Sequence, residues 1–202
     1  MRRYVVALAV AVVLVAVVRS LVVQSFVVPT GSMSPTVHPG DRVIVARWSS
    51  LFGDVRHGDV VVFDGAGVFA PAAARSSSPL AQAGRGIAAA LGVPVGEQDY
   101  VKRVVGLPGE RVVCCDGAGR ITVNGTPLVE PYLEGSGPAS TTPFDVVVPP
   151  GRLWVMGDDR EDSADSRSHL GDPGGGTVPV ERVVGRVVGI YWPVGRVGGV
   201  SR

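Results

Sequence analysis

The start of the chain is apolar in a way that the rest is not. After Arg2 and Arg3, residues 5–18 contain no charged side chain, and the apolar character resumes after Arg19. A helix rises 1.5 Å per residue, so residues 4–23 would span about 30 Å, which is the thickness of a bilayer core. The pattern therefore predicts one N-terminal transmembrane helix, with Arg19 close enough to its end to reach the interface.

A cleaved signal peptide is the alternative, because it has the same basic start and apolar run. No small-x-small cleavage site follows in residues 21–28, so we favour an uncleaved anchor. The two N-terminal arginines place the N-terminus in the cytoplasm. We expect residues 1–28 to form a cytoplasmic tip and anchor, and residues 29–202 to form a domain outside the cytoplasmic membrane.

From residue 29 onward, short β-branched runs alternate with turn residues. Strands are expected at residues 41–46, 59–63, 100–105, 110–114, 121–123, 127–129, 145–148, 153–156 and 183–191. Asn124-Gly125 is a strong hairpin signal, and Gly185 and Gly189 indicate bends in the last strand. The pattern predicts a mainly β domain.

This domain divides by composition. We expect a core of residues 29–63, 99–112 and 150–192 and an inserted β region at 113–149. Residues 64–98 are rich in Ala, Gly, Ser and Pro and are expected to form a long mobile loop, with one weak helical turn near residues 87–91. The Gly-rich segment 171–177 is expected to be an exposed insertion.

Composition supports strands and turns over a helical bundle. The 202 residues include 28 glycines, 16 prolines and 42 valines. The net charge of +1 gives no basic footprint for nucleic acid. Of 19 basic residues, 18 are arginine, and Lys102 is the single lysine. Arginine stays protonated near neutral pH whereas a buried lysine can lose its proton, so Lys102 is a candidate for chemistry.

Cys114 and Cys115 are adjacent on a predicted strand. Neighbours on a strand point to opposite faces, and a bond between them falls outside the usual disulfide geometry. We therefore expect two partly buried, unbonded cysteines.

Residues 31–36 read Gly-Ser-Met-Ser-Pro-Thr, directly after the predicted anchor. A serine here could be a nucleophile if a base lies within hydrogen-bond reach; otherwise the segment is an ordinary Ser/Thr-rich linker. The three histidines, His38, His57 and His169, could each supply that base, because a Ser-His-Asp triad is defined by geometry and not by order.

Lys102 is the other candidate base. On a strand, Tyr100 and Lys102 share one face, so Lys102 can point inward while Arg103 reaches solvent. Burial lowers the pKa of a lysine, and the free amine can then act as a general base. The alternative is a surface lysine whose ammonium group extends into water.

Residues 157–171 form a polar loop, with five acidic residues between 158 and 165. A calcium loop is excluded because the spacing lacks the glycine at its sixth position and the terminal glutamate. A loop that braces itself fits better, with Asp158, Asp165, Arg160 and Arg167 pairing among themselves and Ser163 free to bond a neighbour. No metal or other cofactor is expected.

Four segments together resemble type I signal peptidases: residues 29–36, 40–45, 100–110 and 157–167, in the family's order behind an apolar start. The resemblance implies a signal-peptidase-like (LexA-like) β fold with one transmembrane helix. It implies a membrane-bound serine endopeptidase that uses a Ser/Lys dyad. Such an enzyme removes signal peptides from exported preproteins on the outer side of the cytoplasmic membrane, cutting after small residues at positions −3 and −1. Its partners would be signal peptides and the lipid bilayer.

By position, the resemblance makes Ser32 the nucleophile and Lys102 the general base. The oxyanion hole would be the Ser32 N–H and the Thr30 hydroxyl. Ser163 would hydrogen-bond and orient Lys102. The other implied residues are Asp165 and Arg167 to hold the loop, Tyr100 to line the cleft, and Phe26, Val28, Pro29, Met33, Val101 and Val104 to shape small apolar pockets. Asp159 and Asp162 stand where the family often has asparagine.

Two other hypotheses come from different classes. A related Ser/Lys peptidase that cleaves itself, as LexA-like repressors do, would need a DNA-binding domain and would not need an anchor. A membrane-tethered β domain that only binds partners would leave the single lysine and the acidic loop without a role.

Overall fold

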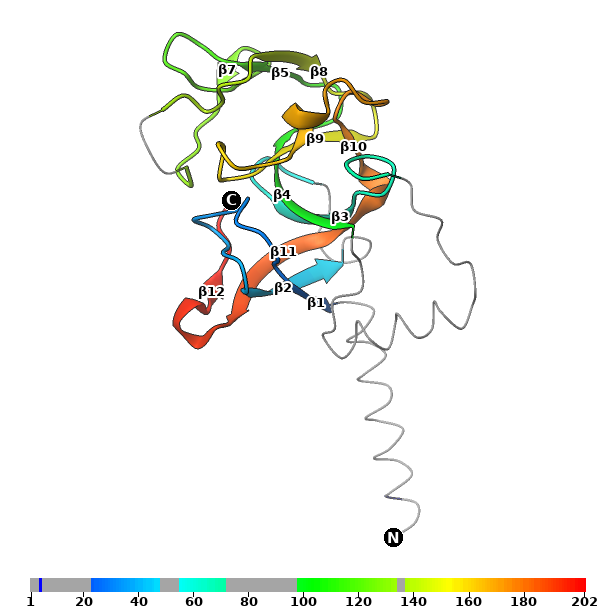
Figure 1. Cartoon of the computed structure of the whole chain (residues 1–202), viewed down its shortest axis with the longest axis vertical. Helices are drawn as coiled ribbons and strands as arrows, with labels where there is room; N and C mark the ends of the chain where they lie inside the picture. The colour runs from blue at the N-terminus through cyan, green and yellow to red at the C-terminus, as the bar shows by residue number, and fades with distance from the viewer. Residues whose placement is uncertain (1–3, 5–22, 48–54, 72–97, 134–136) are drawn as a thin grey trace.

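The computed structural model describes residue 4 and residues 23–47, 55–71, 98–133 and 137–202. Two antiparallel sheets make up this part of the chain, one above the other in the view of Figure 1. The mainly β architecture predicted from the Val-, Gly- and Pro-rich sequence is confirmed.

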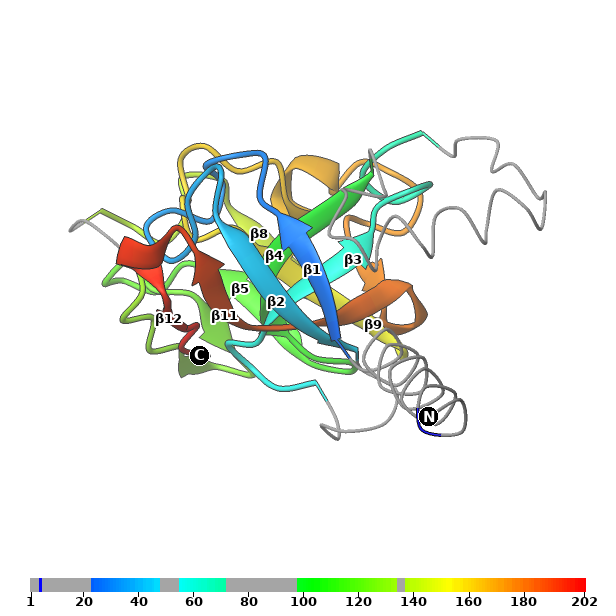
Figure 2. The same ribbon diagram turned by 90° about the horizontal axis from the view of Figure 1, so that it is seen from below.

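The larger sheet has eight strands in the order β1-β2-β11-β3-β4-β9-β10, and β12 pairs with β11. Their bounds are β1 (Val23–Val27), β2 (Arg42–Arg47), β3 (Val60–Asp64), β4 (Asp99–Gly106), β9 (Arg152–Met156), β10 (Val178–Pro179), β11 (Val183–Trp192) and β12 (Gly198–Gly199). The long strand β11 lies between β2 and β3 (Figure 1), and the view from below in Figure 2 shows β1 lying beside β2. Its predicted bends are confirmed, because its register shifts at Gly185 and Gly189.

The smaller sheet has four strands in the order β7-β6-β5-β8. They are β5 (Arg111–Cys114), β6 (Thr122–Val123), β7 (Thr126–Pro127) and β8 (Phe144–Val147). Asn124 and Gly125 both have positive φ, as a tight hairpin between β6 and β7 requires. Three short 3-10 helices complete the described elements: η1 (Ser166–His169), η2 (Val180–Arg182) and η3 (Val194–Arg196).

Buried residues form three apolar clusters. One joins the smaller sheet to β9 around Trp154 and Phe144. A second lies around Met33, Val43 and Val62. The third lies around Phe63, Val104 and Leu153. β3 and β4 contribute to more than one cluster, so the strand that carries Lys102 is packed on both faces.

The predicted boundary of the anchor is wrong at its C-terminal end. Val23–Val27, which were assigned to the anchor, form β1 and pair with β2 over their whole length. The polar residues Gln24 and Ser25 fit an edge strand, where one side of the backbone is paired, better than a bilayer core. Residues 5–22 lie outside the described part of the chain, and no helix within that part is long and apolar enough to span a membrane.

The loop predicted at residues 64–98 is ordered at its start. The turn at residues 65–70 closes with hydrogen bonds from Val68, Phe69 and Ala70 to the Gly65 carbonyl. Phe69 is buried against Phe63 and Tyr100, with ring centroids 5.3 and 5.5 Å away. Residues 72–97, including the expected helical turn, lie outside the described residues.

Two further expectations need correction. Cys114 and Cys115 are joined by a disulfide. β5 ends at Cys114, so the alternation assumed for two strand neighbours does not apply to Cys115. In the segment 171–177 only the first part is exposed: Thr177 is buried, and its hydroxyl accepts a hydrogen bond from Arg152 at 2.6 Å.

Candidate active site

Ser32 lies in the tight segment between β1 and β2. The Val28 N–H donates to the Asp41 carbonyl, and the Gly40 N–H donates to the Val28 carbonyl. These two hydrogen bonds hold the two ends of the segment together. Ser32 itself is 8% exposed. Its hydroxyl is therefore held at the edge of the core, directly after an edge strand.

Lys102 reaches the same place from the middle of the larger sheet. It lies on β4, between β3 and β9, and is 3% exposed. Its Nζ donates to the Ser32 Oγ at 2.5 Å, and the Thr30 Oγ1 lies 3.3 Å from that same oxygen. Two segments 70 residues apart in the sequence thus bring an amine and two hydroxyls together.

Burial lowers the pKa of Lys102 to about 8, because the ammonium ion is removed from water. The carboxylates of Asp165 and Asp158 act in the opposite direction and favour the charged form. A neutral amine in contact with a serine hydroxyl can accept its proton, so the arrangement can generate an oxygen nucleophile.

The prediction that the Arg103 side chain reaches solvent is wrong. Its side chain is fully buried, where the strand pattern had placed it in solvent. Its guanidinium binds both oxygens of Asp158, at 2.8 and 2.6 Å, and also donates to the Thr36 hydroxyl at 3.2 Å. Thr36 in turn donates to Asp158. The ionic partner supplied by Asp158 makes burial of this arginine possible.

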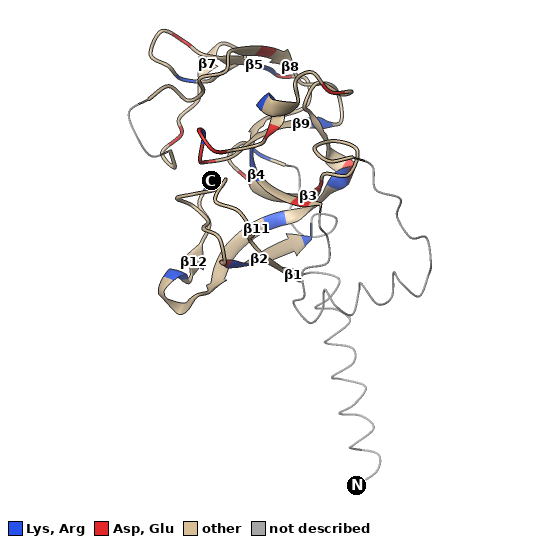
Figure 3. Ribbon diagram, in the orientation of Figure 1, with Lys and Arg blue, Asp and Glu red and all other residues tan. Residues whose placement is uncertain are grey.

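The loop that follows β9 contacts Ser32 through its backbone. Asp159 N–H donates to the Ser32 carbonyl at 3.2 Å. Gly157 lies so close that a Cβ there would be 2.3 Å from this carbonyl oxygen. The loop carries several of the acidic positions drawn red in Figure 3, and one of them, Asp158, pairs with Arg103 of β4.

Asp165 and Arg167 form the buried pair that the sequence suggested. The two side chains meet at 2.7 and 2.9 Å, and Asp165 also accepts the Gly157 N–H at 3.0 Å. Burial tends to raise the pKa of Asp165, but the hydrogen bonds and charge of Arg167 outweigh it and hold the pKa below its usual value. The other expected partners differ: Asp158 pairs with Arg103 and Arg160 pairs with Glu130.

Ser163 does not form the predicted hydrogen bond to Lys102. Its Oγ is buried, and within the described residues it has no hydrogen-bond partner of good geometry. It lies near the Asp165 carboxylate, whose pKa it helps to lower, and 2.2 Å from the position that a Cβ of Gly157 would occupy. The hydroxyl therefore lies in the crowded space around Gly157, close to the Asp165 carboxylate.

The residues expected to shape the pockets fall into two groups. Val28 and Met33 are buried together, with Phe26 and Val101 packed against them. Val104 belongs to the cluster around Phe63 and Leu153, with Tyr100 packed against it. Pro29 is exposed. Tyr100 stacks on Phe63 at 5.7 Å and lies near the Phe69 carbonyl.

None of the three histidines contacts Ser32 in the described structure. His57 bonds to Glu110 and the Val105 carbonyl, each at 3.0 Å. His169 bonds to Asp172 and stacks on Phe69. His38 bonds through its backbone to Asp41. The side chain that does contact the Ser32 hydroxyl is that of Lys102. Nor does any group of three or more His, Cys, Asp or Glu in the described ranges lie close enough together to hold a metal ion.

Sequence reasoning missed a set of polar residues around the site. Thr36, Arg103, Glu130, Tyr132 and Arg160 are linked by hydrogen bonds or ring contacts to the strand of Lys102 and to the loop after β9. Glu130 and Tyr132 come from the connection between β7 and β8, where no periodic pattern marks their direction. A signal existed only for Arg160, as a charged residue in the acidic loop.

The described structure is a mainly β fold that places a serine hydroxyl against a buried amine. A family model described as "Signal peptidase, peptidase S26" matches residues 1–192. The chain belongs to this family and is a peptidase.

Several curated relatives cover nearly the whole chain. It is 39% identical to signal peptidase I of Mycobacterium tuberculosis, over 98% of this chain and 74% of that protein. It is 38% identical to a probable signal peptidase I of Mycobacterium leprae, over 87% and 71%. It is 32% identical to signal peptidase I of Leptolyngbya laminosa, over 95% and 79%. A crystal structure of a signal peptidase I from Enterococcus faecalis aligns at 22% identity with a TM-score of 0.43, covering 68% of this chain and 99% of that one.

Proposed function

We propose that this chain is a membrane-bound serine endopeptidase that removes signal peptides from exported preproteins. Ser32 is the nucleophile and Lys102 is the general base. Cleavage follows small residues at positions −3 and −1. The 2.5 Å contact between the Lys102 Nζ and the Ser32 Oγ, at a buried amine with a lowered pKa, carries the proposal.

In the first step, the neutral Lys102 amine takes the proton of the Ser32 hydroxyl as its oxygen attacks the scissile carbonyl. The negative charge that develops on the carbonyl oxygen is stabilised by the Ser32 N–H and the Thr30 hydroxyl. Thr30 is exposed and lies 3.3 Å from the nucleophile, which leaves it accessible to an incoming substrate. The protonated Lys102 then donates its proton to the leaving amine, and an acyl-enzyme remains.

In the second step, Lys102 takes a proton from a water molecule, which attacks the ester. The tetrahedral intermediate collapses, Ser32 regains its proton from Lys102, and the signal peptide leaves with a free carboxylate. A single group therefore acts as base and acid in turn, which requires a pKa near the working pH. The lowered pKa of Lys102 meets this requirement.

The substrate binds in an extended conformation along the exposed side of β1. This strand ends the described part of the larger sheet, so its outer backbone groups can pair with an added strand. β1 leads directly to the segment that holds Ser32. We expect Val28 and Met33, with Phe26 and Val101 packed against them, to shape pockets that accept small side chains beside the nucleophile. Tyr100 is expected to line the cleft.

Residues 1–22 anchor the protein in the cytoplasmic membrane, with the peptidase domain outside. Support comes from the uncharged run at residues 5–18 and from exposed apolar side chains at Trp192, Val194 and Val197. Trp192 pairs with Arg42, which pairs with Val27, so Trp192 lies at the end of the sheet from which the chain continues to Ser32. A bilayer in contact with this edge would place the site next to emerging substrates.

The experiment is cleavage of a preprotein by the full chain purified in detergent, with the cut mapped by mass spectrometry. We expect one cut after a small residue, and no cut with Ser32→Ala. Ser34→Ala is the matched control, since Ser34 is in the same turn but does not contact Lys102. A Ser32→Ala protein that still cleaves would exclude the proposed nucleophile. A wild type that binds the preprotein without cutting it would favour the binding domain instead.

A further inference from the structure

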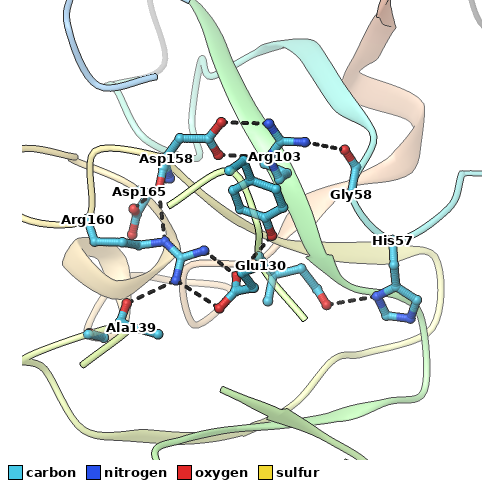
Figure 4. Close-up of polar contacts among 12 residues, drawn as sticks. His57, Gly58, Arg103, Glu130, Ala139, Asp158, Arg160 and Asp165 are labelled. Carbon is cyan, nitrogen blue, oxygen red and sulfur yellow. Dashed lines mark hydrogen bonds and ion pairs between the residues drawn. The ribbon is translucent and has the colours of Figure 1, made fainter. Parts of the chain in front are cut away.

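A buried ion pair joins the connection between β7 and β8 to the loop after β9. Arg160 donates to both carboxylate oxygens of Glu130, and the two side chains are 7% and 5% exposed. Figure 4 shows Arg160 at the centre of these contacts. The ion pair therefore connects a loop of the smaller sheet to the loop that contacts Ser32.

Arg160 also binds two backbone carbonyls. Its Nε donates to the Gly157 carbonyl at 3.0 Å, and its Nη1 donates to the Ala139 carbonyl at 3.0 Å. Gly157 and Ala139 come from the two segments that the ion pair connects. The planar guanidinium therefore fixes the distance between those segments at several points, which a point charge could not do.

Tyr132 extends this contact to the strand of Lys102. Its hydroxyl donates to Glu130 at 2.9 Å, and its ring lies 3.7 Å from the central guanidinium carbon of Arg103. Arg103 is the neighbour of Lys102 on β4 and binds Asp158 in the same loop. We refer to Glu130, Tyr132 and Arg160 as the Arg160 clamp. It touches both the loop after β9 and the base-carrying strand.

The loop held in this way sets the place of Ser32. Arg160 binds the Gly157 carbonyl, and two residues later the Asp159 N–H binds the Ser32 carbonyl. With a Cβ at Gly157 only 2.3 Å from that carbonyl, the two backbones have no spare room. A shift of the loop therefore moves Ser32 relative to Lys102.

A buried ion pair adds little net stability compared with apolar packing, so stability alone does not account for one at this position. The charges that most affect the pKa of Lys102 are those of Asp165, Asp158, Arg167 and Asp162. Neither Glu130 nor Arg160 is in this group, so the clamp acts on the site through geometry.

We propose that Glu130, Tyr132 and Arg160 are positioning residues that set the distance between Ser32 and Lys102, and that the inserted β region thereby completes the active site. This proposal rests on the proposed function for the identity of the reacting groups. It gives the smaller sheet, which contributes no reacting group, a direct role in the rate.

The test uses the full chain in detergent with three variants: Glu130→Gln, Arg160→Lys and the double variant. A misplacement of reacting groups by 1 Å can cost about 100-fold, so we expect each single variant to lower kcat by about 10- to 100-fold. KM should change by less than about threefold, because the substrate-binding edge is untouched. The double variant should lose little more than the worse single one, because both break the same contact.

Asp145→Asn is the matched control. It removes an ion pair with Arg111 in the same smaller sheet, but that pair is exposed and does not touch the loop after β9. We expect its kcat to equal that of the wild type. All rates are measured well below the lowest Tm of the set and are divided by the folded fraction.

The pH profile separates geometry from charge. In the clamp variants, the pH at which kcat/KM reaches half its maximum should equal that of the wild type, while the maximum value itself should fall. The proposal is overturned if the plateau rate of the variants equals that of the wild type, or if the losses of kcat in the two single variants add up in the double variant. It is also overturned if the loss of kcat disappears after correction for the folded fraction, or if the pH midpoint shifts while the plateau rate stays normal. If Ser32→Ala keeps activity, the proposed nucleophile fails, but the clamp is still judged by the cleavage rates of its own variants.

Discussion

Arg103 and Asp158 form an ion pair whose side chains are both fully buried, one residue along β4 from Lys102. Replacing Asp158 with Asn leaves the guanidinium charged and without its counterion. Loss of one partner of a buried pair costs about 3–5 kcal/mol, so we expect a corresponding fall in the free energy of unfolding. Urea unfolding of the full chain measures it. Asp145→Asn, which breaks an exposed pair, should change it far less. Equal effects of the two substitutions would contradict the importance of burial.

The activity should depend on pH through Lys102. Burial lowers its pKa to about 8, and the base is active only when neutral. We therefore expect kcat/KM to rise with pH through about 8 and to fall on acidification, as the amine gains its proton. Initial rates on one preprotein from pH 6 to pH 10 test this. A midpoint near 10.5, the ordinary value for lysine, would show that the amine is not buried in solution.

The same pKa shift has a consequence for stability. The unfolded chain holds the Lys102 proton up to about pH 10.5, whereas the folded protein releases it near pH 8. Between these values the unfolded state binds more protons, so the contribution of this residue to the free energy of unfolding increases as pH rises. Comparison with Lys102→Met isolates that contribution.

Lys102→Arg should be nearly inactive. Both side chains are long and cationic, so an ionic role would survive the exchange. A guanidinium stays protonated across the working range, and the loss of base catalysis alone is about 10²–10⁴-fold. Single-turnover cleavage detects a residual rate of this size. Retained activity, together with loss in a His57 or His169 variant, would assign the reaction to a histidine.

Ser163→Ala should lower the rate without destabilising the fold. The Oγ is buried and forms no hydrogen bond of good geometry in the described structure, so its removal should leave Tm nearly unchanged. We expect the rate to fall by about 10-fold, if the hydroxyl bonds the ammonium group of Lys102 once it has formed. Cleavage rates and thermal unfolding of the same preparation give both values. A full rate with a raised Tm would leave Ser163 without a part in the reaction.

The residue before the cut should have to be small. Phe in place of Ala at position −1 of a preprotein would have to fit next to the buried Val28 and Met33. Overfilling a packed site costs about 1–3 kcal/mol or more, so processing should fall by about 5- to 150-fold or more. The ratio of kcat/KM for the two substrates is the measurement. Equal values would refute the predicted specificity.

The sequence was informative wherever local chemistry determines structure. Turn residues such as Asn124-Gly125 and β-branched runs marked most of the strands, because both act over a few residues. The contact between Ser32 and Lys102 could be proposed because the motifs around both residues resemble a family. The edge strand β1 was missed because an apolar strand and the end of an apolar helix look alike in sequence.

Contacts between distant segments could not be predicted in this way. Strand alternation predicts that Arg103 is exposed. It is buried because it forms an ion pair with Asp158, which lies 55 residues away in sequence. Spacing predicts that Arg160 pairs within its own loop, but it pairs with Glu130 from the connection between β7 and β8. Partner choice of this kind depends on tertiary packing, on which the spacing of charges carries no information.

The position of β11 between β2 and β3 bears on when the protein becomes active during its synthesis. β2, which follows the Ser32 segment, does not pair with β3 or with β4, which carries Lys102. β11 pairs with both β2 and β3 and so joins the two halves of the sheet. β11 begins at Val183, far beyond both Ser32 and Lys102 in the chain. A nascent polypeptide that has passed these two residues therefore still lacks the strand that joins them, and the contact between them can form only after β11 has been made.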